Sequence, residues 1–233
     1  MRQAILKALE KSPYEEKAQI LSKATGNVYK KSLGALAKEG LGYKDVNPRT
    51  HGSMIRLLQD ESKRKLICVP RGCLKSSIAC VAYPIWLLIN NPNLRILIDS
   101  ELFTNSATFI REIKQHLESP ELTELFGEFK GSTWNSDELI IRQRTKKLKE
   151  ASITAGGVGT TKVGQHFDVI IHDDLNSPSN SNTTENAQKV IDHFKYNISI
   201  LENLGTMVVV GTRYSAMDVI QFILDNEDVE RCD

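Results

Sequence analysis

A basic and hydroxyl-bearing cluster follows a short apolar run near residue 70. Residues 69–77 read Val-Pro-Arg-Gly-Cys-Leu-Lys-Ser-Ser. A phosphate-binding loop uses backbone N–H groups to hold phosphates, a lysine to reach the β and γ phosphates, and a hydroxyl to bind Mg²⁺. Lys75 and Ser76 fit these uses, whereas Leu74 replaces one standard glycine and Gly72 stands alone inside the loop. The predicted nucleotide-binding residues are Pro70, Arg71, Gly72, Cys73, Leu74, Lys75, Ser76 and Ser77.

A second chemical signal is a pair of acids at the end of an apolar run. Residues 167–174 read Phe-Asp-Val-Ile-Ile-His-Asp-Asp. A magnesium nucleotide site needs one carboxylate in the metal shell and a neighbour that orients and deprotonates water. We assign Asp173 to Mg²⁺ and Asp174 to water. Strand alternation turns His172 to the other face, which predicts packing or a hydrogen bond for it rather than catalysis.

A third polar group, Gly211-Thr212-Arg213, follows the apolar run 207–210. Each signal alone has an ordinary reading: a chance Lys-Ser pair, a turn or helix cap at the acids, or a plain strand end. All three follow predicted strands, and ligands of parallel sheets lie at the carboxyl ends of strands. Their coincidence predicts a nucleotide site.

The surrounding elements alternate between strands and helices. Apolar runs predict strands at 66–69, 94–99, 139–141, 152–154, 167–174 and 207–210, and helical periodicity marks 76–88, 105–117 and 186–201. This order favours an α/β fold with a largely parallel sheet and helices on both faces. Residues 1–48 are predicted to form a small helical appendage and residues 49–233 the main core.

Composition restricts the cellular setting. The 233 residues carry a formal net charge of +1 with 25% charged residues, so no global basic field indicates nucleic acid. The four cysteines show neither a pairing framework nor metal-like spacing, which favours a reducing compartment. No uninterrupted apolar run approaches the ~18 residues of a membrane span. We therefore expect no membrane partner.

The motifs together resemble the large terminase subunits of tailed bacteriophages. Residues 70–76 resemble that family's deviant Walker A, 164–175 its Walker B in the subgroup that carries Asp-Asp, and 211–214 its coupling motif, with Asp218 as the acid that follows. The resemblance runs from about residue 50 to 225. It implies the ASCE or RecA-like class of P-loop NTPase.

The resemblance also implies a function. The chain would hydrolyse ATP with Mg²⁺ and translocate double-stranded DNA into a procapsid, in the cytoplasm of an infected bacterial host. Its implied partners are DNA, the portal and procapsid, the small terminase subunit and further copies of itself in a ring. Lys75, Asp174 and Arg71 would be catalytic, and Gly211, Thr212 and Arg213 would couple hydrolysis to movement. The family's C-terminal nuclease domain is not recognisable, so we expect no DNA cleavage.

The family commonly has an arginine before Walker B that reaches a neighbouring subunit. Lys162 occupies that place, although lysine lacks the planar two-pronged donor of arginine. The nearest upstream arginines, Arg142 and Arg144, lie in the basic run 142–149, which is either a solvated hairpin or a contact to DNA or a subunit. The glycine-rich residues 156–161 are either a nucleotide-responsive loop or a surface turn.

Two other functions remain open from the sequence. One is a helicase-like DNA translocase outside packaging, since the same strand ends serve many motors. The other is a nucleotide-binding assembly module that hydrolyses nothing by itself.

Overall fold

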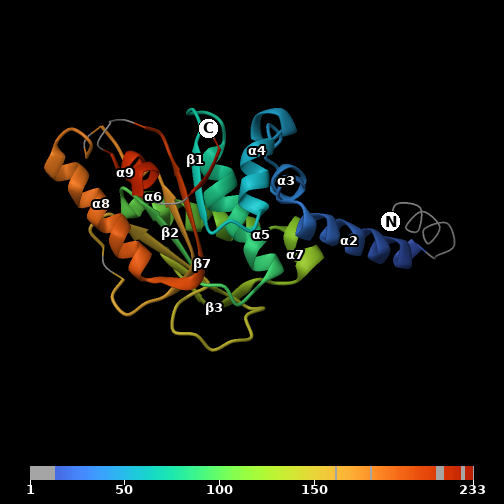
Figure 1. Cartoon of the computed structure of the whole chain (residues 1–233). Coiled ribbons are helices and arrows are strands. Elements are labelled where there is room, and N and C mark those ends of the chain that lie inside the picture. Colours follow the sequence, from blue (N-terminus) through green and yellow to red (C-terminus); the bar gives the residue numbers. More distant parts are fainter. Residues whose placement is uncertain (1–13, 161, 179, 214–217, 227–228, 233) are drawn as a thin grey trace.

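The structure is a computed structural model that describes residues 14–160, 162–178, 180–213, 218–226 and 229–232. Within them, eight strands form one sheet in the order β3-β4-β5-β2-β6-β7-β1-β8 (Figure 1). Their bounds are β1 (Arg64–Cys68), β2 (Ile96–Ser100), β3 (Lys130–Trp134), β4 (Glu138–Ile141), β5 (Ile153–Gly157), β6 (Phe167–Asp173), β7 (Leu201–Gly211) and β8 (Glu230–Cys232).

The six neighbouring strands β5, β2, β6, β7, β1 and β8 are parallel to one another. Strands β3 and β4, at one edge of the sheet, pair in the antiparallel sense. Strands β6, β7 and β1 are consecutive neighbours. Asp173 pairs with Val210 and Cys68 with Gly211. The phosphate loop, the acid pair and the Gly211-Thr212-Arg213 group therefore lie at the carboxyl ends of three adjacent strands. The α/β fold with a largely parallel sheet is confirmed.

Helices cover both faces of the sheet (Figure 1). On one face, α8 and α9 pack over a cluster that includes Leu66 and Leu97; on the other, a larger cluster includes Ile67 and Ile98. Neighbouring residues of one strand thus enter opposite cores, as the period of two requires. The helix bounds are α2 (Tyr14–Lys31), α3 (Leu33–Ala35), α4 (Pro48–Gln59), α5 (Tyr83–Asn90), α6 (Phe103–Leu117), α7 (Pro120–Phe126), α8 (Thr184–Ser199) and α9 (Val219–Asn226).

Two π-helical segments, Leu36–Gly40 and Ser77–Ala82, adjoin these helices. The second follows the phosphate loop and runs directly into α5, whose second residue, Pro84, has no N–H to donate to the preceding turn. The predicted helix at 76–88 is thus present with a wider first turn.

The N-terminal helical segment reaches the main core. Helix α2 extends to one side of the sheet (Figure 1), and the indole N–H of Trp86 donates to the Lys30 carbonyl at 2.9 Å. Leu33 and Leu36 are fully buried in the same cluster as Ile67. Helix α4 starts where the Asn47 side chain accepts the Thr50 N–H at 2.9 Å. No helix in the described part of the chain is both long and apolar enough to cross a membrane.

The elements without a sequence prediction include the edge strands β3 and β8 and the short helix α7. Strand β3 reads Lys-Gly-Ser-Thr-Trp, and β8 has only three residues, so neither carries a clear apolar period. The predicted pair at 139–141 and 152–154 is present, since Leu139 of β4 lies opposite Ile153 of β5.

Candidate active site

The phosphate loop joins β1 to the π-helical segment and contains unusual backbone conformations. Gly72 has φ of 83° and Leu74 has φ of 48°. Such left-handed values suit glycine but cost an L-residue with a bulky side chain free energy. Leu74 stands where the standard motif has its second glycine, and it adopts the conformation that this glycine would favour. Its carbonyl then accepts the Ile78 N–H at 2.9 Å, which starts the helical segment after the loop.

Lys75 brings the three strand ends together. Its side chain is buried, with 6% of the residue exposed. The ammonium Nζ lies 3.2 Å from Asp174 Oδ2 and donates to Thr212 Oγ1 at 3.4 Å. One lysine thus contacts the residues that follow β6 and β7, and it stands on the loop that follows β1.

Ser76 and Asp173 form the second contact across the site. The Ser76 hydroxyl donates to Asp173 Oδ1 at 2.7 Å. Burial raises the pKa of Asp173 to about 6, and the neighbouring Asp174 charge adds to the increase, while the Ser76 hydrogen bond and the Lys75 charge oppose it. The buried Cys80 thiol also contacts this carboxylate, and burial raises the pKa of that thiol. A cation beside Asp173 would favour its ionised form.

Asp174 is positioned by a second strained backbone bend. Its φ is 41°, and its N–H donates to the Val210 carbonyl at 2.9 Å. Leu74 and Asp174 are the two non-glycine residues with positive φ among the described residues, and both adjoin the site. Asp174 Oδ1 is buried and has no hydrogen-bond partner in the described part of the chain. Such an unpartnered acceptor is a suitable group to receive a donor from a reacting water.

A buried polar network lies behind the acids. Asp99 on β2 is 1% exposed, and its Oδ2 accepts hydrogen bonds from His172 Nδ1 at 3.1 Å, His193 Nε2 at 2.8 Å and Asn197 Nδ2 at 3.0 Å. His172 therefore makes a hydrogen bond on the far face, as strand alternation predicts. Sequence reasoning missed the roles of Asp99, His193 and Asn197. The available signal was the i, i+4 polar pair His193 and Asn197 on the buried side of α8.

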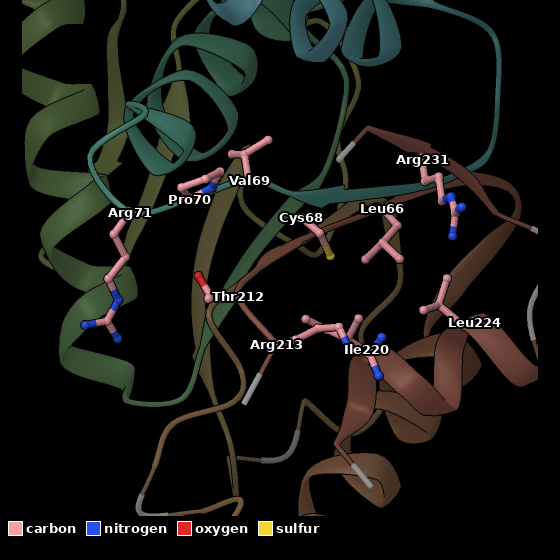
Figure 2. Close-up of a pocket in the computed structure, with 10 residues that line it drawn as sticks. All are labelled: Leu66, Cys68, Val69, Pro70, Arg71, Thr212, Arg213, Ile220, Leu224 and Arg231. Carbon is pink, nitrogen blue, oxygen red and sulfur yellow. The ribbon is translucent and has the colours of Figure 1, made fainter. Parts of the chain in front are cut away.

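A cavity of about 660 Å³ lies beside the phosphate loop. Pro70 and Arg71 of the loop and Thr212 and Arg213 after β7 line it. Figure 2 shows the Arg71 side chain directed away from the apolar group formed by Leu66 and Ile220. Arg213 Nη2 donates to Gln221 Oε1 of α9 at 2.5 Å.

The predicted acidic residue of the coupling motif has a structural contact. Asp218 is fully buried, and its Oδ1 accepts the Gln221 N–H at 3.0 Å near the start of α9. Tyr214 of the same motif lies outside the described residues. Gly211 packs closely, because a Cβ there would lie 3.2 Å from Ile220 Cδ1.

Two of the basic residues expected to act on a neighbour, Arg142 and Arg144, lie away from Lys75. Arg142 and Arg144 follow β4 near Asn93, where β2 begins. They therefore lie at the amino ends of the parallel strands, whereas the phosphate loop lies at the carboxyl ends. Arg142 pairs with Glu128, and Arg144 Nη1 donates to the Glu150 carbonyl at 2.7 Å. Half-buried Lys162 lies in the connection from β5 to β6.

The glycine-rich segment before Lys162 forms a turn. The Thr160 N–H donates to the Gly157 carbonyl at 2.9 Å, and its hydroxyl donates to the same carbonyl at 2.7 Å. Thr161 lies outside the described residues.

The acids and hydroxyl suit Mg²⁺. Magnesium is commonly held by one or two carboxylates together with substrate phosphates and water, rather than by a cage of protein ligands. Ser76 and Asp173 supply an oxygen pair of that kind, already within 2.7 Å of each other. No cluster of three or more His, Cys, Asp or Glu side chains able to hold a metal occurs among the described residues. The phosphates of a bound nucleotide would complete such a shell.

Comparison with known proteins finds similarity to a curated protein in sequence and to solved structures in fold. No family model matches the chain. The large terminase subunit of Enterobacteria phage T3 is 29% identical over 177 residues, which cover 73% of this chain and 29% of that protein. The large terminase of bacteriophage HK97 has a similar fold, with a TM-score of 0.56 at 12% identity over 84% of this chain and 40% of that one.

A second solved structure shares the fold. It is the S. cerevisiae Dbp5 complex with Nup159, Gle1, IP6 and ADP, in which the matching chain gives a TM-score of 0.53 at 12% identity over 86% of this chain and 52% of that one. At these identities the structural likeness concerns the fold alone.

Proposed function

We propose that this chain, which is similar in sequence to the large terminase subunit of Enterobacteria phage T3, is the ATPase portion of a motor that packages double-stranded DNA. The observation that carries the proposal is the direct contact of Lys75 with Asp174 and Thr212, beside the Ser76 and Asp173 pair. These residues follow three adjacent strands. The matched region spans 29% of the T3 protein, so the activity of the whole motor belongs to the proposal.

The proposed reaction is in-line attack of water on the γ phosphate of ATP. Lys75 and Arg71 would neutralise the charge that develops on the phosphate oxygens, and Asp174 would orient the water and accept its proton. Ser76 and Asp173 would hold Mg²⁺, which neutralises phosphate charge when bound. Most of the rate enhancement would come from positioning and from fixed charges, as is general for phosphoryl transfer.

Thr212 supports a link between hydrolysis and movement. Its hydroxyl accepts from Lys75, and it directly follows β7, the strand between β6 and β1. A change in the phosphates at Lys75 would alter this contact and reach β7. The portal, the procapsid, the small terminase subunit and a ring of copies are the proposed partners in converting that change into DNA translocation.

The first test is Lys75→Ala, measured as ATP turnover in the motor assembled with portal, procapsid and DNA. We expect turnover to fall by about 100-fold or more, because a buried charge that stabilises the transition state is lost. Lys189→Ala is the matched control, since this lysine lies on the surface of α8 with 64% of its side chain exposed. Unchanged turnover in the Lys75 variant would contradict the proposal.

The same assay separates the alternatives. A packaging ATPase is stimulated by portal and procapsid, whereas a helicase-like translocase responds to DNA alone. An assembly module binds nucleotide in the complete assembly and shows no turnover there.

A further inference from the structure

The cavity beside the phosphate loop has a wall of apolar side chains. Leu66 of β1 and Ile220 and Leu224 of α9 line it, and Figure 2 shows these three side chains facing the same space. Its volume of about 660 Å³ lies within the range of roughly 300–1,000 Å³ that is usual for small-molecule sites. An apolar wall of this kind provides contact area but no charge.

Two exposed arginines lie at the same cavity. Arg213 follows β7 and is held by Gln221, while Arg231 belongs to β8 on the other side of β1. Guanidinium groups are planar and stack on aromatic rings and on the faces of nucleic-acid bases. The cavity therefore combines apolar contact with planar cations, which suits a flat heteroaromatic ring joined to an anionic group.

The cavity adjoins the phosphate loop. Pro70 and Arg71 of the phosphate loop line it, as does Thr212. The Thr212 hydroxyl lies 3.4 Å from Lys75 Nζ. Thr212 therefore stands between Lys75 and the cavity, which places the cavity beside any phosphates held at Lys75.

We propose that this cavity receives the base and ribose of the nucleotide, which are held by Leu66, Ile220 and Leu224 and by stacking on Arg213 or Arg231. The inference rests on the proposed nucleotide hydrolysis, and it adds the part of the site that recognises the nucleoside. Strand β8 and helix α9 are then part of the nucleotide site, although neither belongs to the phosphate loop or to the strand that carries the acids.

The test compares a nucleotide with its phosphate part alone. Binding of ATP and of inorganic tripolyphosphate, each with Mg²⁺, is measured by calorimetry for the whole chain and for Leu224→Trp. The larger indole fills space in the cavity but lies away from Lys75. We expect the variant to bind ATP about tenfold more weakly while tripolyphosphate binding changes less than about twofold. Leu21→Trp, on α2, is the matched control, because Leu21 is 50% exposed and remote from the cavity.

The outcomes distinguish this inference from the proposed function. Unchanged ATP binding in a folded Leu224→Trp variant overturns the base site, as does an equal loss of ATP and tripolyphosphate binding. Failure of the unmodified chain to bind either ligand overturns the proposed function, and the base site with it.

A second measurement needs no variant. Photo-crosslinking of the unmodified chain with 8-azido-ATP places the label where the base lies, and the labelled peptides are identified by mass spectrometry. We expect label within residues 219–226 or 230–232, with competition by excess ATP. Label confined to other segments overturns the inference even if every Leu224 variant fails to fold.

Discussion

At the residue scale, the most unusual positions are Leu74 and Asp174, which adopt left-handed backbone conformations without being glycine. Such conformations cost about 1–2 kcal/mol for an L-residue and persist where the surrounding structure fixes them. Here they flank the ion pair: Leu74 precedes Lys75, and Asp174 is the partner of Lys75. The backbone strain is therefore located where the proposed chemistry takes place.

At Leu74 we predict that glycine is a more stabilising replacement than alanine, which reverses the usual order of these two residues. Leu74→Gly and Leu74→Ala both remove the same apolar side chain beyond Cβ, but only glycine adopts φ of 48° without strain. We expect the glycine variant to be more stable than the alanine variant by about 1 kcal/mol, measured as the free energy of unfolding in urea.

Leu87 provides the matched control. It is half-buried inside α5, where the alanine variant should be the more stable by about 1 kcal/mol. If alanine is also the more stable residue at position 74, the left-handed conformation does not determine stability there.

At the element scale, the Asp99 network fixes α8 against β2 and β6. Burial opposes ionisation of Asp99, but hydrogen bonds from His172 and His193 outweigh it and lower its pKa to about 2. Since this pKa is lower in the folded chain than in the unfolded chain, ionised Asp99 stabilises the fold above about pH 4. That contribution is lost as the pH falls through about 2.

Asp99→Asn tests this contribution. We expect it to lower the free energy of unfolding by roughly 2 kcal/mol at pH 7 and by about half as much at pH 3, in urea titrations at both pH values. Asp192→Asn is the control on the same helix, because Asp192 is exposed and contacts Gln188. An Asp99→Asn effect that is the same at both pH values would count against the ionised carboxylate.

Most elements could be predicted from the sequence because buried strands of a parallel sheet read as apolar runs. Strands β3 and β8 lie at the two edges of the sheet, where burial is incomplete and the pattern fades. The phosphate loop and the acids were recognisable because their chemistry demands particular residue types. The Asp99 network was not, since its members come from β2, β6 and α8 and meet only in the folded chain.

At the scale of the whole molecule, the proposed motor includes a residue of one subunit that acts on the nucleotide site of its neighbour, and Lys162 is the candidate. We predict that chains carrying Lys75→Ala and chains carrying Lys162→Ala, each inactive alone in the assembled motor, regain ATP turnover when mixed. In a head-to-tail ring, about one quarter of the sites in an equal mixture would contain both lysines. Turnover near that fraction of the unmodified motor is the expected result.

The control replaces Lys162→Ala by Arg144→Ala in the same mixture. Arg144 lies at the opposite sheet edge, where its guanidinium bonds the Glu150 carbonyl. If ATP turnover recovers in the mixture with Arg144→Ala chains and not in the mixture with Lys162→Ala chains, the residue that acts on the neighbouring subunit belongs to the basic run and is not Lys162.

The direction of the sheet has a consequence for any assembly of this chain. The phosphate loop and the acids follow the ends of β1 and β6, whereas the basic run 142–149 lies where β2 begins. A five-residue strand separates its amino end from its carboxyl end by about 17 Å. Copies placed side by side with their sheets aligned would form a particle with two unlike faces, one bearing the nucleotide chemistry and one bearing positive charge. Such an assembly is polar before it binds any partner, because its two faces differ.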